Sequence, residues 1–229
     1  MFAMSQPCPP APAVTGSAAD FIPSRPTLPK LREAARCCRG CHLWMNATQT
    51  VFGEGASPAD VMFVGEAPGD LEDRAGHPFV GPAGKLLDRA MLEAGLDRKR
   101  AYLTNSVKHF KFVVIERGRR LHKKPNAAEV RACNPWLGEE IRLVKPRVVV
   151  ALGATAAQEL LGKQFRVTQQ RGKPMPTDVA EAIIATVHPS AVLRAPDAER
   201  ERARREFVAD LKRVATYLRR PKAKVAGSR

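Results

Sequence analysis

Residues 61–84 read VMFVGEAPGDLEDRAGHPFVGPAG, and the change of character inside this stretch decides the kind of fold. VMFVG (61–65) is an apolar run with the length of a buried strand. Residues 65–84 contain five glycines, three prolines and four acidic residues, which predicts a long loop whose backbone amides can approach a ligand. Such loops also occur without a ligand, and this spacing is not the G-x-G-x-x-G fingerprint of dinucleotide sites. A helical pattern follows from Ala83, and a helix N-terminus favours anions.

Strand and helix patterns alternate along the rest of the chain. Apolar runs predict further strands at AYLTN (101–105), RVVVALG (147–153) and AIIATVH (182–188), and helical periodicity begins at Ala127 and Ala154. Strands separated by helices imply right-handed crossovers and a mostly parallel sheet covered on both faces. We therefore predict an α/β fold, a single three-layer α/β/α domain with a mostly parallel central sheet. Its active site is expected beyond the carboxyl ends of the strands.

The polar and aromatic residues that follow the predicted strands are candidates for such a site. They are Glu66, Asp70, Phe79, Asn105, His188 and Ser190. A carboxylate there can orient a water or stabilise a cation, an aromatic ring can stack on a base, and an amide can read one edge of a pyrimidine. Each type also has an ordinary structural use, as a solvated acid, a core aromatic, a capping amide or a structural histidine.

The charge of the chain indicates its partner. The 229 residues carry a formal net charge of +15, with a pI near 10.2. A basic surface of this size attracts phosphate backbones, so nucleic acid is the leading partner, although an anionic membrane or an acidic protein also fits. No apolar run has the length of a spanning helix, and the N-terminal residues do not resemble a signal peptide. We expect a cytoplasmic protein.

Five cysteines indicate thiols or metal ligands rather than disulfides in a reducing compartment. CCRGCHLW places Cys38 and Cys41 in a C-x2-C spacing beside Cys37, and Cys133 lies far downstream. Such a spacing lets one turn present two thiolates to a zinc ion or an iron-sulfur cluster. Buried free thiols are the alternative.

The two ends differ from the centre in composition. Residues 1–28 are rich in Pro, Ala and Ser without periodicity, which predicts a disordered leader before a domain at 29–218. From Asp197 a final helix is predicted, with apolar residues at helical spacing at Phe207, Leu211, Val214 and Leu218. Residues 219–229 are basic and aperiodic, which predicts a disordered tail that adds DNA affinity or solubility.

Seven motifs in order carry a family resemblance over about residues 38–218. GEAPG, GHPFVGPAG, TN with VKH, ACNPWL, VVVALGATA and HPS resemble the iron-sulfur branch of the uracil-DNA glycosylase superfamily. The resemblance implies that fold, a uracil-containing DNA substrate and a monomeric enzyme that flips out and excises uracil. It implies uracil binding by Gly65, Phe79, Asn105 and His188. His188 would stabilise the departing base, and Glu66 or Asp70 the sugar cation or the attacking water.

The resemblance also implies a [4Fe-4S] cluster. Cys38, Cys41 and Cys133 match three of the four cysteines that hold it in family-4 members, and His109 stands where the remaining cysteine would be. Imidazole can replace thiolate on iron. Cys37 is the rival fourth ligand, and Cys8 a poor one.

RGRRLHKKP (117–125) surrounds His122 with cations, which favours its neutral, nucleophilic form on an anionic substrate unless it is an incidental loop residue. HFKF followed by GRRLH is similar to the X-type branch (UdgX), in which the loop histidine attacks the sugar and stays bound to DNA. His122 is then the nucleophile. The expected DNA contacts are Arg119, Arg120, Lys123, Lys124 and Ser190.

Two positions depart from the X-type pattern and leave alternatives open. Ala67 stands where that branch usually has Gln, and Gly118 where it has Lys. The alternatives are a conventional glycosylase that turns over, and a non-catalytic iron-sulfur module that binds DNA.

Overall fold

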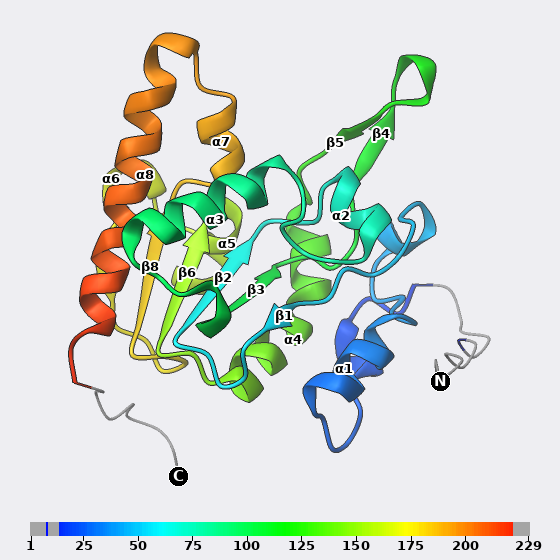
Figure 1. Cartoon of the computed structure of the whole chain (residues 1–229). Coiled ribbons are helices and arrows are strands. Elements are labelled where there is room, and N and C mark those ends of the chain that lie inside the picture. The colour runs from blue at the N-terminus through cyan, green and yellow to red at the C-terminus, as the bar shows by residue number, and fades with distance from the viewer. Residues whose placement is uncertain (1–7, 9–13, 222–229) are drawn as a thin grey trace.

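The computed structural model describes Cys8 and residues 14–221, which form a three-layer α/β/α domain around a central sheet (Figure 1). Four strands are parallel and central, namely β2 (Val61–Gly65), β3 (Ala101–Asn105), β6 (Val148–Leu152) and β8 (Ala182–Thr186). The strand order is β1-β3-β2-β6-β8-β7, with the short edge strands β1 (Glu54–Gly55) and β7 (Pro174–Met175) antiparallel to their neighbours. The four predicted strands are confirmed. The two edge strands were not predicted, because two residues leave no periodicity to detect.

Helices cover both faces of the sheet because every residue of its four central strands is buried. Alternate strand residues, among them Phe63 and Val150, pack with α3 (Pro82–Ala94) and α8 (Asp197–Leu218). The residues between them, such as Met62 and Val149, pack with α4 (Ala127–Val144), α5 (Ala154–Leu161) and α6 (Val167–Gln170). The predicted helices at Ala83, Ala127, Ala154 and Asp197 are thereby confirmed.

A third packing unit lies at the N-terminal end of the chain. The 3-10 turns η1 (Ala18–Phe21) and η2 (His42–Met45) and the helix α1 (Leu28–Ala35) pack against α4 around the fully buried Trp136. The prediction of a disordered leader was therefore wrong for residues 14–28, where Thr27 caps α1 and Ala18 is fully buried. Residues 1–7 and 9–13 lie outside the described residues, as do residues 222–229 of the predicted tail.

Three smaller elements surround the carboxyl ends of the strands. The glycine-rich stretch after β2 is not a continuous loop, since it contains the helix α2 (Asp70–Ala75) between Gly69 and Gly76. After β3 comes a hairpin of β4 (Phe112–Val114) and β5 (Arg120–His122), joined by the turn η4 (Glu116–Gly118). Figure 1 shows this hairpin standing away from the sheet at the upper right. The turn η3 (Arg98–Arg100) precedes β3, and α7 (Pro189–Leu193) follows β8.

Across the described ranges, no helix has both the length and the apolar character needed to cross a membrane.

A buried ion pair joins the segment after β3 to α4. The side chains of Lys108 and Glu140 are both fully buried, with 2.6 Å between Lys108 Nζ and Glu140 Oε2. Lys108 Nζ also donates to the Thr104 hydroxyl at 2.7 Å and to the Asn105 carbonyl at 2.6 Å. Glu140 accepts hydrogen bonds from the Tyr102 hydroxyl, the Thr104 hydroxyl and the Gly53 amide. Each charge thus has several partners, as burial requires.

We expect Lys108→Met to lower the free energy of unfolding by about 3–5 kcal/mol, because it leaves the Glu140 carboxylate buried without a cation. The double variant Lys108→Met with Glu140→Gln should recover most of this loss, since no unpaired charge remains. Urea unfolding measures both. Arg142→Met is the control, because it breaks a partly exposed ion pair with Glu139 on the same helix and should change stability by less than about 1 kcal/mol. Equal losses in the single and double variants would contradict this account.

Candidate active site

Three sheet and loop residues meet at the carboxyl end of β2. Gly65 and Asn105 are neighbours across the β2–β3 pair, and a Cβ at Gly65 would lie 2.3 Å from Asn105 Oδ1 and 2.8 Å from Phe79 Cζ. Any side chain at Gly65 would therefore collide with both. The expectation that parallel strands bring their following residues together is met for these positions.

Phe79 is held in an unusual backbone conformation. Its φ is 57°, in the left-handed region that non-glycine residues rarely occupy, and its ring is buried. A Cβ at Gly84 in the first turn of α3 would lie 1.6 Å from the Phe79 carbonyl oxygen, so the loop packs onto a helix that must have glycine there. The Phe79 ring stacks near His188, with centroids 6.3 Å apart and planes 29° apart.

His188 is oriented by the residue two positions after it. The Ser190 amide donates to His188 Nδ1 at 3.2 Å, and the Ser190 hydroxyl lies 2.7 Å from the same nitrogen. Because Nδ1 accepts, the neutral ring carries its hydrogen on Nε2. Burial, followed by the charges of Arg194 and His122, lowers the pKa of His188 to about 4. At neutral pH His188 is thus a neutral donor, and Ser190, predicted to contact DNA, is bonded to it.

Glu66 and His122 face each other near this cluster. The distance between Glu66 Oε1 and His122 Nε2 is 4.0 Å, while the Thr155 hydroxyl on α5 donates to Glu66 Oε2. His122 lies on β5, and its side chain is 42% exposed. Burial, with a smaller contribution from Arg194, lowers the pKa of His122 despite the opposing effect of Glu66. The sequence had indicated Arg119 and Arg120 as the cause.

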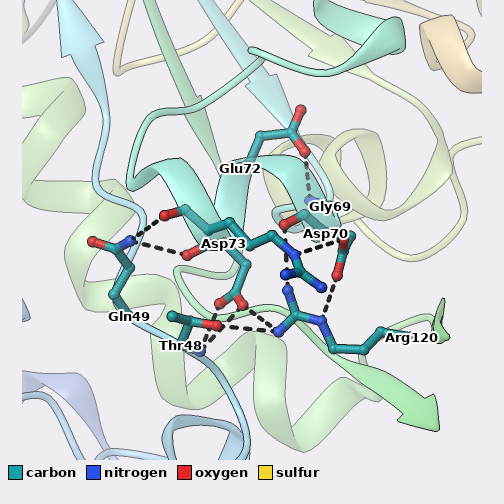
Figure 2. A network of polar contacts seen from close by, with 8 residues as sticks. Thr48, Gln49, Gly69, Asp70, Glu72, Asp73 and Arg120 are labelled. Atoms are coloured by element: carbon teal, nitrogen blue, oxygen red, sulfur yellow. Dashed lines mark hydrogen bonds and ion pairs between the residues drawn. The ribbon is translucent and has the colours of Figure 1, made fainter. Parts of the chain in front are cut away.

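Arg120 points into the protein. Its Nη1 lies 2.7 Å from Asp73 Oδ2 and donates to the Thr48 hydroxyl at 3.1 Å, and its Nε bonds to the Asp70 carboxylate (Figure 2). The guanidinium also lies 4.9 Å above the Phe112 ring. Sequence reasoning assigned Arg120 to DNA phosphates, but here it anchors the hairpin to α2. Among its predicted DNA-contacting neighbours, Arg119 and Lys123 have exposed side chains.

The same network gives the two candidate carboxylates, Glu66 and Asp70, different surroundings. Asp70 is bound by Arg74 at 3.0 Å and by Arg120. Although burial acts to raise the pKa of Asp70, hydrogen bonds from Arg74 and Arg120 lower it overall. Of the two carboxylates, Glu66 therefore faces His122, and Asp70 belongs to the anchor of the hairpin.

Glu72 is a site residue that sequence reasoning missed. Its buried carboxylate accepts the amide of Gly69 at 3.1 Å and that of Gly81 at 3.0 Å, so one side chain fixes both ends of the segment that presents Phe79. The available signal was a glutamate three residues after Gly69 at the start of a helix, the position of a capping-box acid.

Three free cysteines and a histidine gather between the N-terminal unit and α4. Cys38, Cys41 and Cys133 belong to one apolar cluster. The indole Nε1 of Trp136 donates to Cys38 Sγ and the Lys108 amide to Cys133 Sγ, each at 3.3 Å. Hydrogen bonds of this kind tune sulfur ligands in iron-sulfur proteins.

His109 lies at the edge of this group in a form suited to ligation. Its Nε2 is 2.9 Å from the Thr50 hydroxyl, which itself donates to the Ala35 carbonyl. Nε2 must therefore donate, which leaves the lone pair on Nδ1. Burial lowers the pKa of His109 to about 4, so the ring is neutral. Cys38 and His109 line one cavity of about 210 Å³.

No three His, Cys, Asp or Glu side chains among Cys8 and residues 14–221 converge on a single metal ion. The ligands of a four-iron cluster bind different irons and stand farther apart, so the donor set still fits a cluster. Cys37 is joined to Cys8 by a disulfide, with 5.3 Å between their Cα atoms. This corrects the expectation that the cysteines form no disulfide, and it removes Cys37 as the rival ligand.

Comparison with known proteins gives consistent matches. A family model described as the uracil DNA glycosylase superfamily matches residues 52–212. The type-4 uracil-DNA glycosylase of Thermotoga maritima is 34% identical over 189 residues, which is 82% of this chain and 93% of that protein. That of Pyrobaculum aerophilum is 39% identical over 176 residues, covering 74% and 86%. That of Sulfurisphaera tokodaii is 36% identical over 179 residues, covering 75% and 78%.

The protonation state of His188 gives a pH prediction. An unfolded histidine takes up a proton near pH 6.5, whereas folded His188 does so only near pH 4. Its contribution to stability is therefore constant above pH 6.5 and is lost as the pH falls, by about 3 kcal/mol at pH 4. Urea unfolding across this range should show a shallower acid loss in His188→Gln than in the wild type. Identical pH profiles would contradict a neutral buried His188.

Proposed function

Because the chain belongs to the uracil DNA glycosylase superfamily, we propose that it excises uracil from DNA and that His122 captures the sugar left behind. The observation that carries the proposal is the meeting of two groups of residues. Gly65, Phe79 and Asn105 form a place for a flat polar base. Glu66 and His122 face each other at 4.0 Å beside it.

Base recognition follows from the chemistry of the first group. The extruded uracil would stack on Phe79, and the Asn105 amide offers both a donor and an acceptor to its polar edge. Glycine at position 65 lets both side chains lie against the end of β2. The loop conformation at Phe79 is fixed before DNA arrives, because Glu72 and Gly84 hold its flanks.

Departure of the base needs stabilisation on two sides. As the glycosidic bond breaks, its electron pair leaves with uracil, and the sugar develops positive charge. The Nε2 hydrogen of neutral His188 is suited to stabilise the uracil anion without transferring a proton. The Glu66 carboxylate is suited to stabilise the sugar cation.

Capture by His122 would complete the reaction. The unprotonated ring nitrogen of His122 forms a bond to the anomeric carbon, and the imidazole takes the positive charge that the sugar loses. The products are a uracil anion and an alkylated imidazolium, so charge balances the neutral reactants. The lowered pKa of His122 supports this role because only the neutral ring is nucleophilic. Hydrolytic turnover is the alternative, in which water attacks instead.

The departure at Gly118 does not argue against a placed histidine. Gly118 has a φ of 71° in the tight turn of the hairpin, where glycine is favoured over lysine. The hairpin is anchored instead by Arg120 on Asp70 and Asp73. The exposed Arg119 and Lys123 remain available to DNA phosphates, in single or double strands.

We also propose that Cys38, Cys41, His109 and Cys133 hold a [4Fe-4S] cluster. When bound, it would link the segment between α1 and η2, the segment after β3, and α4 through iron-ligand bonds. No step of the excision uses it, so its role would be architectural.

The capture step predicts a covalent product. Incubation with a uracil-containing oligonucleotide should give a protein-DNA band that survives denaturing electrophoresis. His122→Ser should abolish the band and leave or uncover ordinary excision, because water can then reach the sugar. His77→Ser is the matched control, since that histidine pairs with Glu54 elsewhere and should leave the band unchanged. A wild type that releases abasic DNA without a band would favour turnover, and unmodified DNA would favour a non-catalytic binding module.

The cluster predicts a coloured protein. Purified anaerobically, it should be brown, with broad visible absorption and about four irons per chain. Cys38→Ser should lose the colour and much of the thermal stability, while His109→Cys should keep both. Cys37→Ser changes the neighbouring residue, which lies in the disulfide, and should keep the iron. A colourless, iron-free protein with full stability and activity would overturn the assignment.

A further inference from the structure

The first turn of α5 lies between Glu66 and His188. Gly153, before this helix, has a φ of 90°, and a Cβ there would lie 3.1 Å from His188 Cβ. Glycine therefore lets α5 begin against His188. Two residues on, Thr155 is 8% exposed, and its hydroxyl donates to Glu66 Oε2. Thr155, to which the sequence pattern gave no role, thus touches the carboxylate that faces His122.

The two oxygens of Glu66 are in different surroundings. Oε2 takes the Thr155 hydroxyl, and Oε1 lies 4.0 Å from His122 Nε2. Glu66 is 24% exposed, so water competes for its carboxylate. A glutamate side chain has three rotatable bonds, and fixing it opposes roughly 1.5–2 kcal/mol of rotamer entropy. The part-buried hydrogen bond at Oε2 restrains the carboxylate and leaves Oε1 directed to the side of His122.

We propose that Thr155 is a positioning residue that holds Glu66 toward the anomeric carbon and His122, and so favours capture over hydrolysis. The inference rests on the proposed function. In capture, the His122 nitrogen bonds to the anomeric carbon as uracil leaves with the electron pair. In hydrolysis, a water oxygen forms that bond and its proton passes to a Glu66 oxygen. With Oε2 bonded to Thr155 and Oε1 on the side of His122, the carboxylate is directed to the attacking imidazole rather than to a water.

The test compares three variants of the full-length protein. Thr155→Val keeps the shape of the side chain and removes the hydroxyl, and Thr155→Ser restores the hydroxyl. Thr216→Val is the matched control, because that hydroxyl bonds only locally to the Lys212 carbonyl on exposed α8. The readouts are the single-turnover rate of uracil excision, the fraction of product in the denaturant-stable adduct, and the affinity for DNA without uracil.

We expect Thr155→Val to slow excision about tenfold, the value of one hydrogen bond to a charged group, and to shift product from adduct to free abasic DNA. DNA affinity and thermal stability should stay near wild type, and both Thr155→Ser and Thr216→Val should behave like the wild type. If Thr155 had only a structural role, its replacement by valine would not change the ratio of adduct to free abasic DNA.

The remaining outcomes decide against the inference or against its premise. An unchanged rate and partition in Thr155→Val would overturn the role of Thr155 while leaving the proposed function intact. Parallel losses of excision, DNA affinity and stability, unrescued by serine, would overturn it in favour of a packing role. If the wild type excises uracil without forming an adduct, the capture hypothesis is wrong, and so is the claim that Thr155 sets the ratio of adduct to free product. A wild type without excision would overturn both proposals.

Discussion

The ion pair of Lys108 and Glu140 is fully buried, and the positions of Asn105 at the end of β3 and of Cys133 on α4 depend on it. Lys108 Nζ bonds to the carbonyl of Asn105, and the Lys108 amide donates to Cys133 Sγ. Lys108 therefore joins β3, which carries Asn105, to α4, which carries Cys133. A buried charge tolerates little displacement, because each lost partner leaves an unsatisfied group in a low dielectric. The segment between Asn105 and His109 is thereby fixed at both ends.

Periodicity was sufficient to predict the layers, because the four central strands and four main helices each contain enough residues to repeat a pattern. It could not predict α2, whose six residues stand among glycines, or the hairpin, whose strands have three residues each. The cleft residues Asn105 and His188 were identifiable because each follows a parallel strand. The partners of Arg120 were not, since Asp70 and Asp73 lie about fifty positions earlier and are brought near only by folding. The disulfide at Cys37 was likewise hidden, as spacing alone does not choose a partner.

The basic residues of the hairpin are of two kinds, one paired with acids and the others exposed to solvent. The excess of positive charge is large, yet Arg120, two positions before His122, is paired with two acids of α2. Other basic residues of the hairpin stay exposed. The side chain that anchors the hairpin is therefore not among the exposed side chains that we propose to contact DNA.

The hairpin forms a two-stranded sheet of its own and shares no strand register with the central sheet. Its length can therefore change without disturbing the layers beneath, which is the condition under which insertions are tolerated. Gly65 and Asn105 belong to the ends of the central strands, whereas His122 sits on a separate hairpin that Arg120 anchors to α2. The proposed sugar capture could thus be gained or lost by exchanging this short segment and the two aspartates that receive it, while the residues at the strand ends stay unchanged.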